Sequence, residues 1–187
     1  MDDFDYLPPA QTFLDPEREG VDAPHSARAV VIPFGLEASV SYGGGTAAGP
    51  DAILVASHQL ELFDEELWRE PYRDFGIATI RLPEISSNLD EALGELERIV
   101  AKVRSAGRFP LVLGGEHSLT IGAVRPFLQA HDDLVVLQLD AHADLRDGYL
   151  GEHNSHASAM RPKSRRPWSE GTRRVSTPRS AKFIQAY

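Results

Sequence analysis

The sequence predicts an α/β fold built on a parallel sheet, and three observations support this prediction. Short apolar runs alternate along the chain with segments of helical spacing, which is the order from which parallel sheets are built. The run 133–140 is mainly apolar without alternation, as is typical of a parallel strand covered on both faces. The polar motifs GGEH and DAHAD follow two of the runs, at the strand ends where such sheets bind ligands.

The individual elements can be placed in order along the chain. Strands are predicted over 29–35, 74–80, 108–115 and 133–140, and helices over 49–63, 86–107 and 117–130. In the first helix, Gly49 is the predicted N-cap. The second helix has the clearest limits, because Asn88 and Glu91 form a start resembling a capping box and Gly107 is a stop signal. In the third helix, Pro126 is an unfavourable residue.

The composition excludes several classes of protein. The 187 residues are enough for one domain with a core, and the absence of Cys excludes disulfides, thiolate zinc sites and cysteine nucleophiles. The apolar runs are too short to span a membrane, and the first residues lack the apolar region of a secretory signal. We therefore expect a cytoplasmic protein that does not enter a membrane.

The charge is distributed unevenly. The net charge is −9, yet residues 161–187 hold eight Lys or Arg and only one acidic residue, whereas the other 160 residues hold 11 basic and 27 acidic residues. An acidic body disfavours nucleic acid and favours cationic ligands or metal ions.

The motif DAHAD contains three groups that can bind a metal. Asp140, His142 and Asp144 occupy alternate positions after an apolar run, and alternate positions share one face of a strand. Carboxylate and imidazole ligands suit Mn²⁺, Zn²⁺ or Fe²⁺. The alternative is a solvated acidic turn. His117 ends another predicted strand and favours the metal site as a fourth ligand, although a lone His there could also cap a helix or lie in the core.

Other residues near these motifs have candidate roles. Glu116 is predicted either to orient the metal ligands without binding the metal itself or to be solvated. His156 lies a short loop beyond the motif and could move protons near neutral pH, with His153 as its rival and an ordinary loop histidine as the alternative. The glycine-rich segment 41–50 lacks the Lys-Ser/Thr of a phosphate-binding loop. We interpret it as an active-site or interface loop.

Four motifs together resemble one family. In order, GGGTAAGPDAI, LVLGGEHSLT, LQLDAHADLRD and SHAS are similar to the arginase/agmatinase (ureohydrolase) family, and within it to the bacterial agmatinase branch, over roughly residues 28–160. The resemblance implies a three-layer α/β/α fold around an eight-stranded parallel sheet. It also implies a site with two Mn²⁺ ions in a homo-oligomer, a trimer or hexamer, that hydrolyses a small cationic guanidinium substrate.

The resemblance also implies roles for single residues. His117 and Asp144 would bind the first manganese, His142 the second, and Asp140 both. A hydroxide bridging the metals would attack the guanidinium carbon, and His156 would relay protons to the leaving amine. Agmatine would give urea and putrescine, a step of polyamine biosynthesis. Asp147 and Glu152 are the candidates for contacting the distal amine of the substrate.

The later part of the sequence departs from the family pattern. The family has a second ligand motif, Asp-x-Asp, but the last aspartate here is Asp147. In the family, late strands lie between the strand ending at GGEH and the strand ending at DAHAD. We therefore expect a fold incomplete at its C-terminal side, from a chain truncated or frameshifted after about residue 160. The predicted divisions are an N-terminal arm (1–27), part of a ureohydrolase domain (28–160) and a basic, divergent or disordered tail (161–187).

These features lead to three functional hypotheses. The first is an agmatinase-like hydrolase acting on the C–N bonds of linear amidines, with arginine or guanidinobutyrate as alternative substrates. The second is an inactive fragment with a partial metal site. The third is a binding module in which the basic tail contacts an acidic partner.

Overall fold

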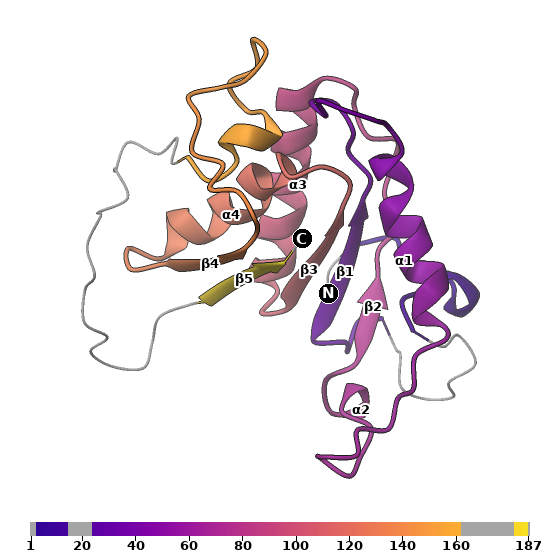
Figure 1. The fold of residues 1–187 in the computed structure, drawn as a ribbon. Coiled ribbons are helices and arrows are strands. Elements are labelled where there is room, and N and C mark those ends of the chain that lie inside the picture. The colour runs from indigo at the N-terminus through magenta and orange to yellow at the C-terminus, as the bar shows by residue number, and fades with distance from the viewer. Residues whose placement is uncertain (1–2, 15–23, 162–181, 187) are drawn as a thin grey trace.

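The computed structural model describes residues 3–14, 24–161 and 182–186 (Figure 1). The strands are β1 (Ala29–Phe34), β2 (Ile77–Thr79), β3 (Phe109–Gly114), β4 (Val135–Leu139) and β5 (Lys182–Ala186). The α-helices are α1 (Gly49–Ser57), α2 (Tyr72–Phe75), α3 (Leu89–Ser105) and α4 (Leu119–Ala130), and the short 3₁₀ helices are η1 (Pro9–Gln11), η2 (Thr46–Ala48) and η3 (His156–Ser158). No helix in these residues combines the length and apolar character needed to cross a membrane.

The main sheet has three parallel strands in the order β2-β1-β3. Helices α3 and α4 cover one face of this sheet and α1 covers the other, so the predicted three-layer α/β/α arrangement is confirmed (Figure 1). Apolar side chains on alternate positions of β1, such as Ile32 and Phe34, are fully buried against Leu93 and Leu96 of α3. The core therefore lies between the sheet and the helix pair, and the carboxyl ends of β1 and β3 lie at one edge.

Helix α3 follows the predicted limits closely. Asn88 has extended backbone angles, and its side-chain oxygen accepts a hydrogen bond of 3.1 Å from the backbone N–H of Glu91. At the other end, Gly107 has a φ of +72°, a left-handed conformation that favours glycine. The buried stripe predicted from the sequence faces the core through residues such as Leu96 and Val100.

Replacing Asn88 with Ala should lower the free energy of unfolding by about 1 kcal/mol, because one N–H in the first turn of α3 loses its partner. Urea denaturation followed by circular dichroism measures this change. Asn88→Asp keeps the accepting oxygen and is the matched control, which should stay close to the wild-type stability. An unchanged Asn88→Ala variant would show that solvent replaces the cap without cost.

Two of the predicted segments are wrong in detail. The first helix begins at Gly49, with Ala48 as its N-cap, and ends at Ser57 instead of continuing to residue 63. The Ser57 hydroxyl donates to the Leu54 carbonyl at 2.6 Å and accepts from the backbone N–H of Leu14, so the N-terminal segment is bound where the helix ends. The segment 74–80 is divided between α2 and β2, because Gly76, with a φ of +64°, redirects the chain between them.

The strand β4 does not join the main sheet in the described residues. It pairs in parallel with β5 alone, and β5 belongs to the segment 161–187 that was predicted to be a divergent tail. The expected coverage of both faces of this strand is wrong, since Val135, Leu137 and Leu139 are 59%, 49% and 53% exposed. The separation of β3 from β4 agrees with the expected incomplete sheet, and the remainder of the predicted tail lies outside the described residues.

Uncovered apolar strand faces should cause self-association. Besides β4, strand β3 exposes Phe109 and Leu111 (61% and 36%), and neighbouring apolar side chains of this kind are prone to aggregation. We expect light scattering to detect species larger than one chain at micromolar concentrations. Leu137→Lys should reduce this association by adding a charge to the exposed face of β4, whereas Leu60→Lys, at an exposed position outside the strands, should not. A monodisperse wild-type chain with sharp, reversible unfolding would contradict this expectation.

Candidate functional site

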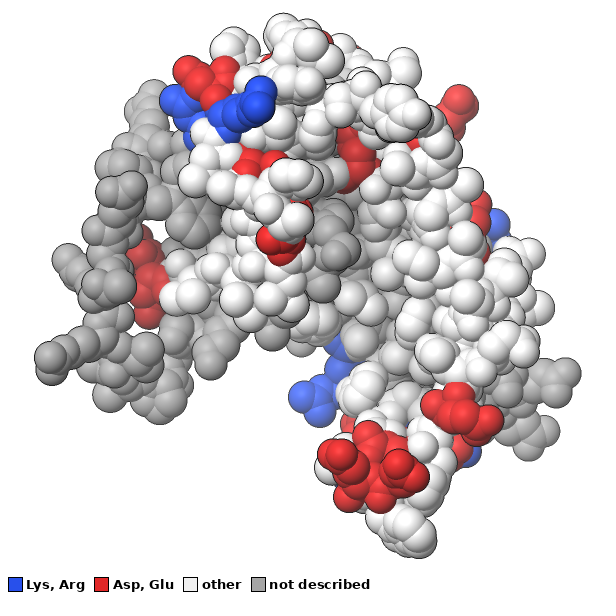
Figure 2. Space-filling model, in the orientation of Figure 1, with Lys and Arg blue, Asp and Glu red and all other residues white. Residues whose placement is uncertain are grey.

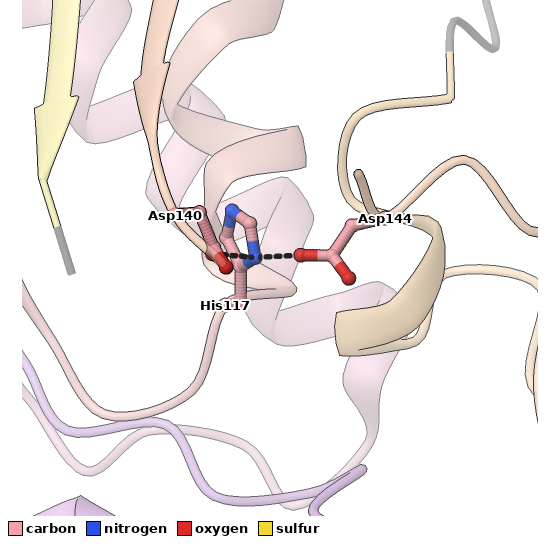
Figure 3. Close-up of side chains that lie close together, drawn as sticks. All are labelled: His117, Asp140 and Asp144. Atoms are coloured by element: carbon pink, nitrogen blue, oxygen red, sulfur yellow. Dashed lines mark hydrogen bonds and ion pairs between the residues drawn. The ribbon is translucent and has the colours of Figure 1, made fainter. Parts of the chain in front are cut away.

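Three of the predicted metal ligands lie together beyond the ends of β3 and β4 (Figure 3). His117 follows β3, whereas Asp140 directly follows β4 and Asp144 lies in the next loop. The Nδ1 atom of His117 is 2.7 Å from Oδ2 of Asp144 and 3.6 Å from Oδ2 of Asp140. The imidazole thus lies between two carboxylates, and each of the three side chains is only 10–13% exposed. No other group of three such residues comes this close within the described ranges.

Local backbone structure orients the two carboxylates. Oδ1 of Asp140 accepts a 2.7 Å hydrogen bond from the backbone N–H of His142, which leaves Oδ2 directed toward His117. This hydrogen bond is the largest cause of a lowered pKa for Asp140, so the group stays ionised at neutral pH. Asp144 has a φ of +49°, a strained conformation for a residue with a side chain. Its carbonyl accepts from the backbone N–H of Met160, which helps to hold that loop.

The electrostatics of His117 suit a metal ligand. Burial lowers the pKa of His117 below its ordinary value of 6.5, although Asp144 and Asp140 oppose this shift. His117 is therefore neutral at pH 7, which is the form that binds metal ions. In the absence of a metal, the proton on Nδ1 can be shared with the carboxylate of Asp144. A divalent cation in its place would gain a nitrogen and two anionic oxygen ligands.

The same pKa shifts predict how stability depends on pH without metal. Because the folded pKa of His117 is below its unfolded value, the unfolded chain binds the proton more readily, so the free energy of unfolding falls as pH drops through 6.5. The contribution of Asp140 is present above 3.8 and is lost as pH falls through its lower folded pKa. Denaturation in the presence of a chelator at a series of pH values measures the free energy of unfolding in both pH ranges. In His117→Gln this free energy should depend less on pH near 6.5. An unchanged pH dependence in that range would contradict the assignment to His117.

The remaining predicted site residues lie outside the three-residue group. The side chain of His142 is 81% exposed, and its Nδ1 atom is 3.4 Å from Oδ1 of Asp140, on the side of that carboxylate away from its Oδ2. Asp147 forms an ion pair with Arg161, and Glu152 is exposed and pairs through its backbone with Tyr149. His142, Asp147 and Glu152 therefore stay predictions.

His156 is held near this group by a residue that the sequence did not single out. Ser39, in the loop after β1, accepts a 3.1 Å hydrogen bond from the backbone N–H of His156 and lies 3.5 Å from its Nδ1. Burial is the main cause of the lowered pKa of His117, and a Coulombic effect of His156 acts in the same direction. Ser39 has no motif that would reveal this role, because the contact joins residues 117 positions apart.

Glu116 is buried beneath the site instead of being solvated. Its Oε2 atom accepts from the backbone N–H groups of Ala38 and Ser39 at 2.7 and 2.6 Å, and its Oε1 atom accepts from the hydroxyls of Ser39 and Ser118. Glu116 thus connects the loops that follow β1 and β3. These partners are not predicted metal ligands, so a supporting role of Glu116 toward the ligands stays a prediction.

The glycine-rich loop is organised by a carboxylate of its own. Oε2 of Glu37 accepts from the backbone N–H groups of Gly45 and Ala47 and from the Thr46 hydroxyl, all at 2.8–2.9 Å. These hydrogen bonds, that from Ala47 first, lower the pKa of Glu37. Gly45 has a φ of +111°, so the loop needs the permissive backbone that the sequence suggested. Because the N–H groups of Gly45 and Ala47 already donate to Glu37, they are not available to bind a phosphate or another anion.

The charged surface shows where ionic ligands could approach. Acidic side chains form several separate groups on the face in Figure 2, and most of the described surface between them is uncharged. The basic groups drawn on this face are few. The described surface in this view therefore favours a small cationic ligand over a polyanion.

Comparison with known proteins places this site in a family. The family model described as "Arginase family" matches residues 27–179. The chain belongs to the arginase family. This arginase-family chain is 39% identical over 152 residues to N(1)-aminopropylagmatine ureohydrolase from Synechocystis sp. and 36% identical over 136 residues to agmatinase from Bacillus anthracis. Its structure resembles the crystal structure of agmatine ureohydrolase from Thermoplasma volcanium, with a TM-score of 0.67 and 34% identity.

The matches cover most of this arginase-family chain but only about half of each relative. They include 78%, 71% and 75% of the chain, and 49%, 46% and 47% of the three relatives respectively. The family and the arginase-like fold are therefore shown, and the site described above lies within the matched part.

Proposed function

We propose that the chain is a manganese-dependent ureohydrolase component that acts on agmatine, releasing urea and putrescine. The observation that carries this proposal is the group of His117, Asp140 and Asp144 at the carboxyl ends of two strands. Support also comes from the relatives named agmatinase and agmatine ureohydrolase. The acidic character of residues 1–160 suits a substrate with two positive charges.

The donor set fits a first-row divalent metal. One imidazole nitrogen and two carboxylates are hard or borderline ligands, and the chain contains no thiolate. His117, Asp140 and Asp144 would hold one Mn²⁺, and His142, next to Oδ1 of Asp140, would contribute to a second. When bound, Mn²⁺ supplies Lewis-acid chemistry that makes water a nucleophile at neutral pH.

The residues of the chain would then handle substrate and protons. Asp140 and Asp144 would offset the charge of a bound Mn²⁺, so the site would repel a guanidinium group less than the bare ion would. His156 lies on the neighbouring η3 turn, where Ser39 holds its backbone, and its imidazole is the candidate group to relay a proton to the leaving amine. Each of these roles can be examined separately by substitution.

The test is a paired measurement on the purified chain. Metal stoichiometry is determined by equilibrium dialysis with Mn²⁺, and urea release is followed with agmatine, N(1)-aminopropylagmatine and arginine. Urea from agmatine that needs Mn²⁺ supports the proposal, whereas urea from only one of the other substrates would assign a different specificity. His156→Gln should bind Mn²⁺ normally but release urea more slowly, by about 10²–10⁴-fold.

A second candidate function is favoured by the three-ligand group itself. A chain that binds one Mn²⁺ and shows no turnover with any of these guanidines would be a metal-binding protein of this family without hydrolase activity. Two Mn²⁺ ions per chain together with turnover would exclude this candidate.

A further inference from the structure

The hydroxyl of Ser39 is the meeting point of two functional side chains. Its Oγ atom lies 2.7 Å from Oε1 of Glu116 and 3.5 Å from Nδ1 of His156, and it accepts from the backbone N–H of His156 at 3.1 Å. A serine hydroxyl has one hydrogen to donate and two lone pairs to accept with. The partners of this hydrogen and these two lone pairs decide which ring nitrogen of neutral His156 carries its hydrogen.

Glu116 accepts hydrogen bonds through both oxygens of its carboxylate. An ionised carboxylate has about four lone-pair positions. Two backbone N–H groups, from Ala38 and Ser39, contact Oε2, and two hydroxyls, from Ser39 and Ser118, contact Oε1. The two N–H groups can only donate, so Oε2 acts as an acceptor, and the Ser39 hydroxyl donates its hydrogen to Oε1.

The single hydrogen of Ser39 is therefore directed to Glu116 and away from His156. A hydrogen bond to an anionic oxygen at 2.7 Å is short and charge-assisted, whereas the contact with the imidazole nitrogen is long at 3.5 Å. The backbone N–H of His156 uses one lone pair of Oγ. The other lone pair of Oγ remains for the contact with Nδ1 of His156. That contact is a hydrogen bond only if Nδ1 carries the hydrogen.

We propose that Glu116, acting through Ser39, holds neutral His156 in the tautomer that is protonated on Nδ1, so that Nε2 is the nitrogen that accepts a proton. Glu116 and Ser39 are then positioning residues. The η3 turn supports this arrangement, because the buried Ser158 hydroxyl donates to the carbonyl of His153 at 2.7 Å and fixes the backbone around His156.

The tautomer follows from the contacts alone, and only the use of Nε2 in catalysis rests on the proposed function. A histidine with an unrestrained ring populates both tautomers, and in the tautomer protonated on Nε2 this nitrogen cannot accept a proton. Holding His156 in the tautomer protonated on Nδ1 keeps Nε2 available in every molecule. The hydrogen bonds join the loops after β1 and β3 to the 153–158 turn, so the fold itself selects the basic nitrogen.

The experiment is ¹⁵N NMR of the imidazole nitrogens, with the seven histidines labelled and His156 assigned by its loss in His156→Gln. It is done without metal or substrate above about pH 8, where histidine is neutral. The expected wild-type spectrum has Nδ1 of His156 in the protonated range and Nε2 in the unprotonated range. A wild-type His156 that is mainly protonated on Nε2 overturns the proposal, whatever the urea assay gives.

Two variants separate positioning from general support of the fold. Ser39→Ala removes the acceptor, so the Nδ1 signal should move toward the unprotonated range, while Ser39→Thr retains the hydroxyl and should restore the wild-type signal. Amide spectra of both variants check that the chain is folded. A Ser39→Ala variant that keeps the wild-type tautomer overturns the role of Ser39. Glu116→Gln, which removes the charge that directs the hydroxyl, should shift the signal in the same direction as Ser39→Ala.

Discussion

Asp140→Asn is expected to lower the affinity for Mn²⁺ by more than about 100-fold, because it removes one of the two anionic ligands of the three-residue group. The Asn side chain keeps the size of Asp and an oxygen that can accept from the backbone N–H of His142. The change therefore isolates the charge. Titration of the chain with Mn²⁺, followed by the electron paramagnetic resonance signal of unbound metal, measures the difference.

Two further variants define what this result means. Asp144→Asn also removes a ligand charge, and Asn tolerates the left-handed φ of +49° at this position, so a loss of affinity cannot be due to backbone strain. Asp147→Asn is the matched control, because Asp147 lies on the same loop but outside the group, in an ion pair with Arg161. Wild-type affinity in Asp140→Asn would place the metal site elsewhere in the chain.

Gly115→Ala is expected to lower the free energy of unfolding by about 1–3 kcal/mol, and also to weaken Mn²⁺ binding. A Cβ atom on Gly115 would lie 2.1 Å from the carbonyl oxygen of Leu36 and 2.9 Å from its carbonyl carbon. Both are backbone atoms, so the loop after β3 or the loop after β1 must move. His117 and Glu116 follow Gly115 directly, and both would be displaced with it.

Gly94→Ala is the matched control, with the same chemical change and the opposite expected sign. Gly94 lies inside α3, and a Cβ atom there would meet nothing within 4 Å. The added methyl group reduces the freedom of the unfolded chain and should stabilise the protein by about 0.5–1 kcal/mol. Urea denaturation of both variants gives the comparison. Equal stabilities for the two variants would show that the close contact at Gly115 relaxes without cost.

The sequence alone predicted the elements whose signals are local. The apolar stripe of α3 repeats at helical spacing, and its ends are marked by Asn88 and Gly107, so both limits could be read without knowledge of the fold. The apolar runs of β1 and β3 and the glycines at their ends were equally clear. The DAHAD motif and His117 pointed to one edge of the sheet, because parallel strands bring their carboxyl ends together.

Errors arose where distant parts of the chain compete with a local pattern. Apolar residues continue at helical spacing as far as Phe63, yet α1 ends at Ser57, where Leu14 binds the serine hydroxyl. Strand β4 has the composition of a strand covered on both faces, but its coverage depends on which strands pair with it. No local sequence pattern indicates that Leu14 contacts the end of α1 or which strand pairs with β4.

The sequence by itself determined the family, the order of most elements and the kinds of side chain that gather at the site. Only the tertiary structure decided that His117 lies between Asp140 and Asp144, that His142 is exposed, and that Ser39 links Glu116 to His156. The physical reason is the range of the interactions. Helical spacing, caps and glycine conformations act within a few residues, whereas these contacts join loops that are distant in sequence and become neighbours only when the strands pair.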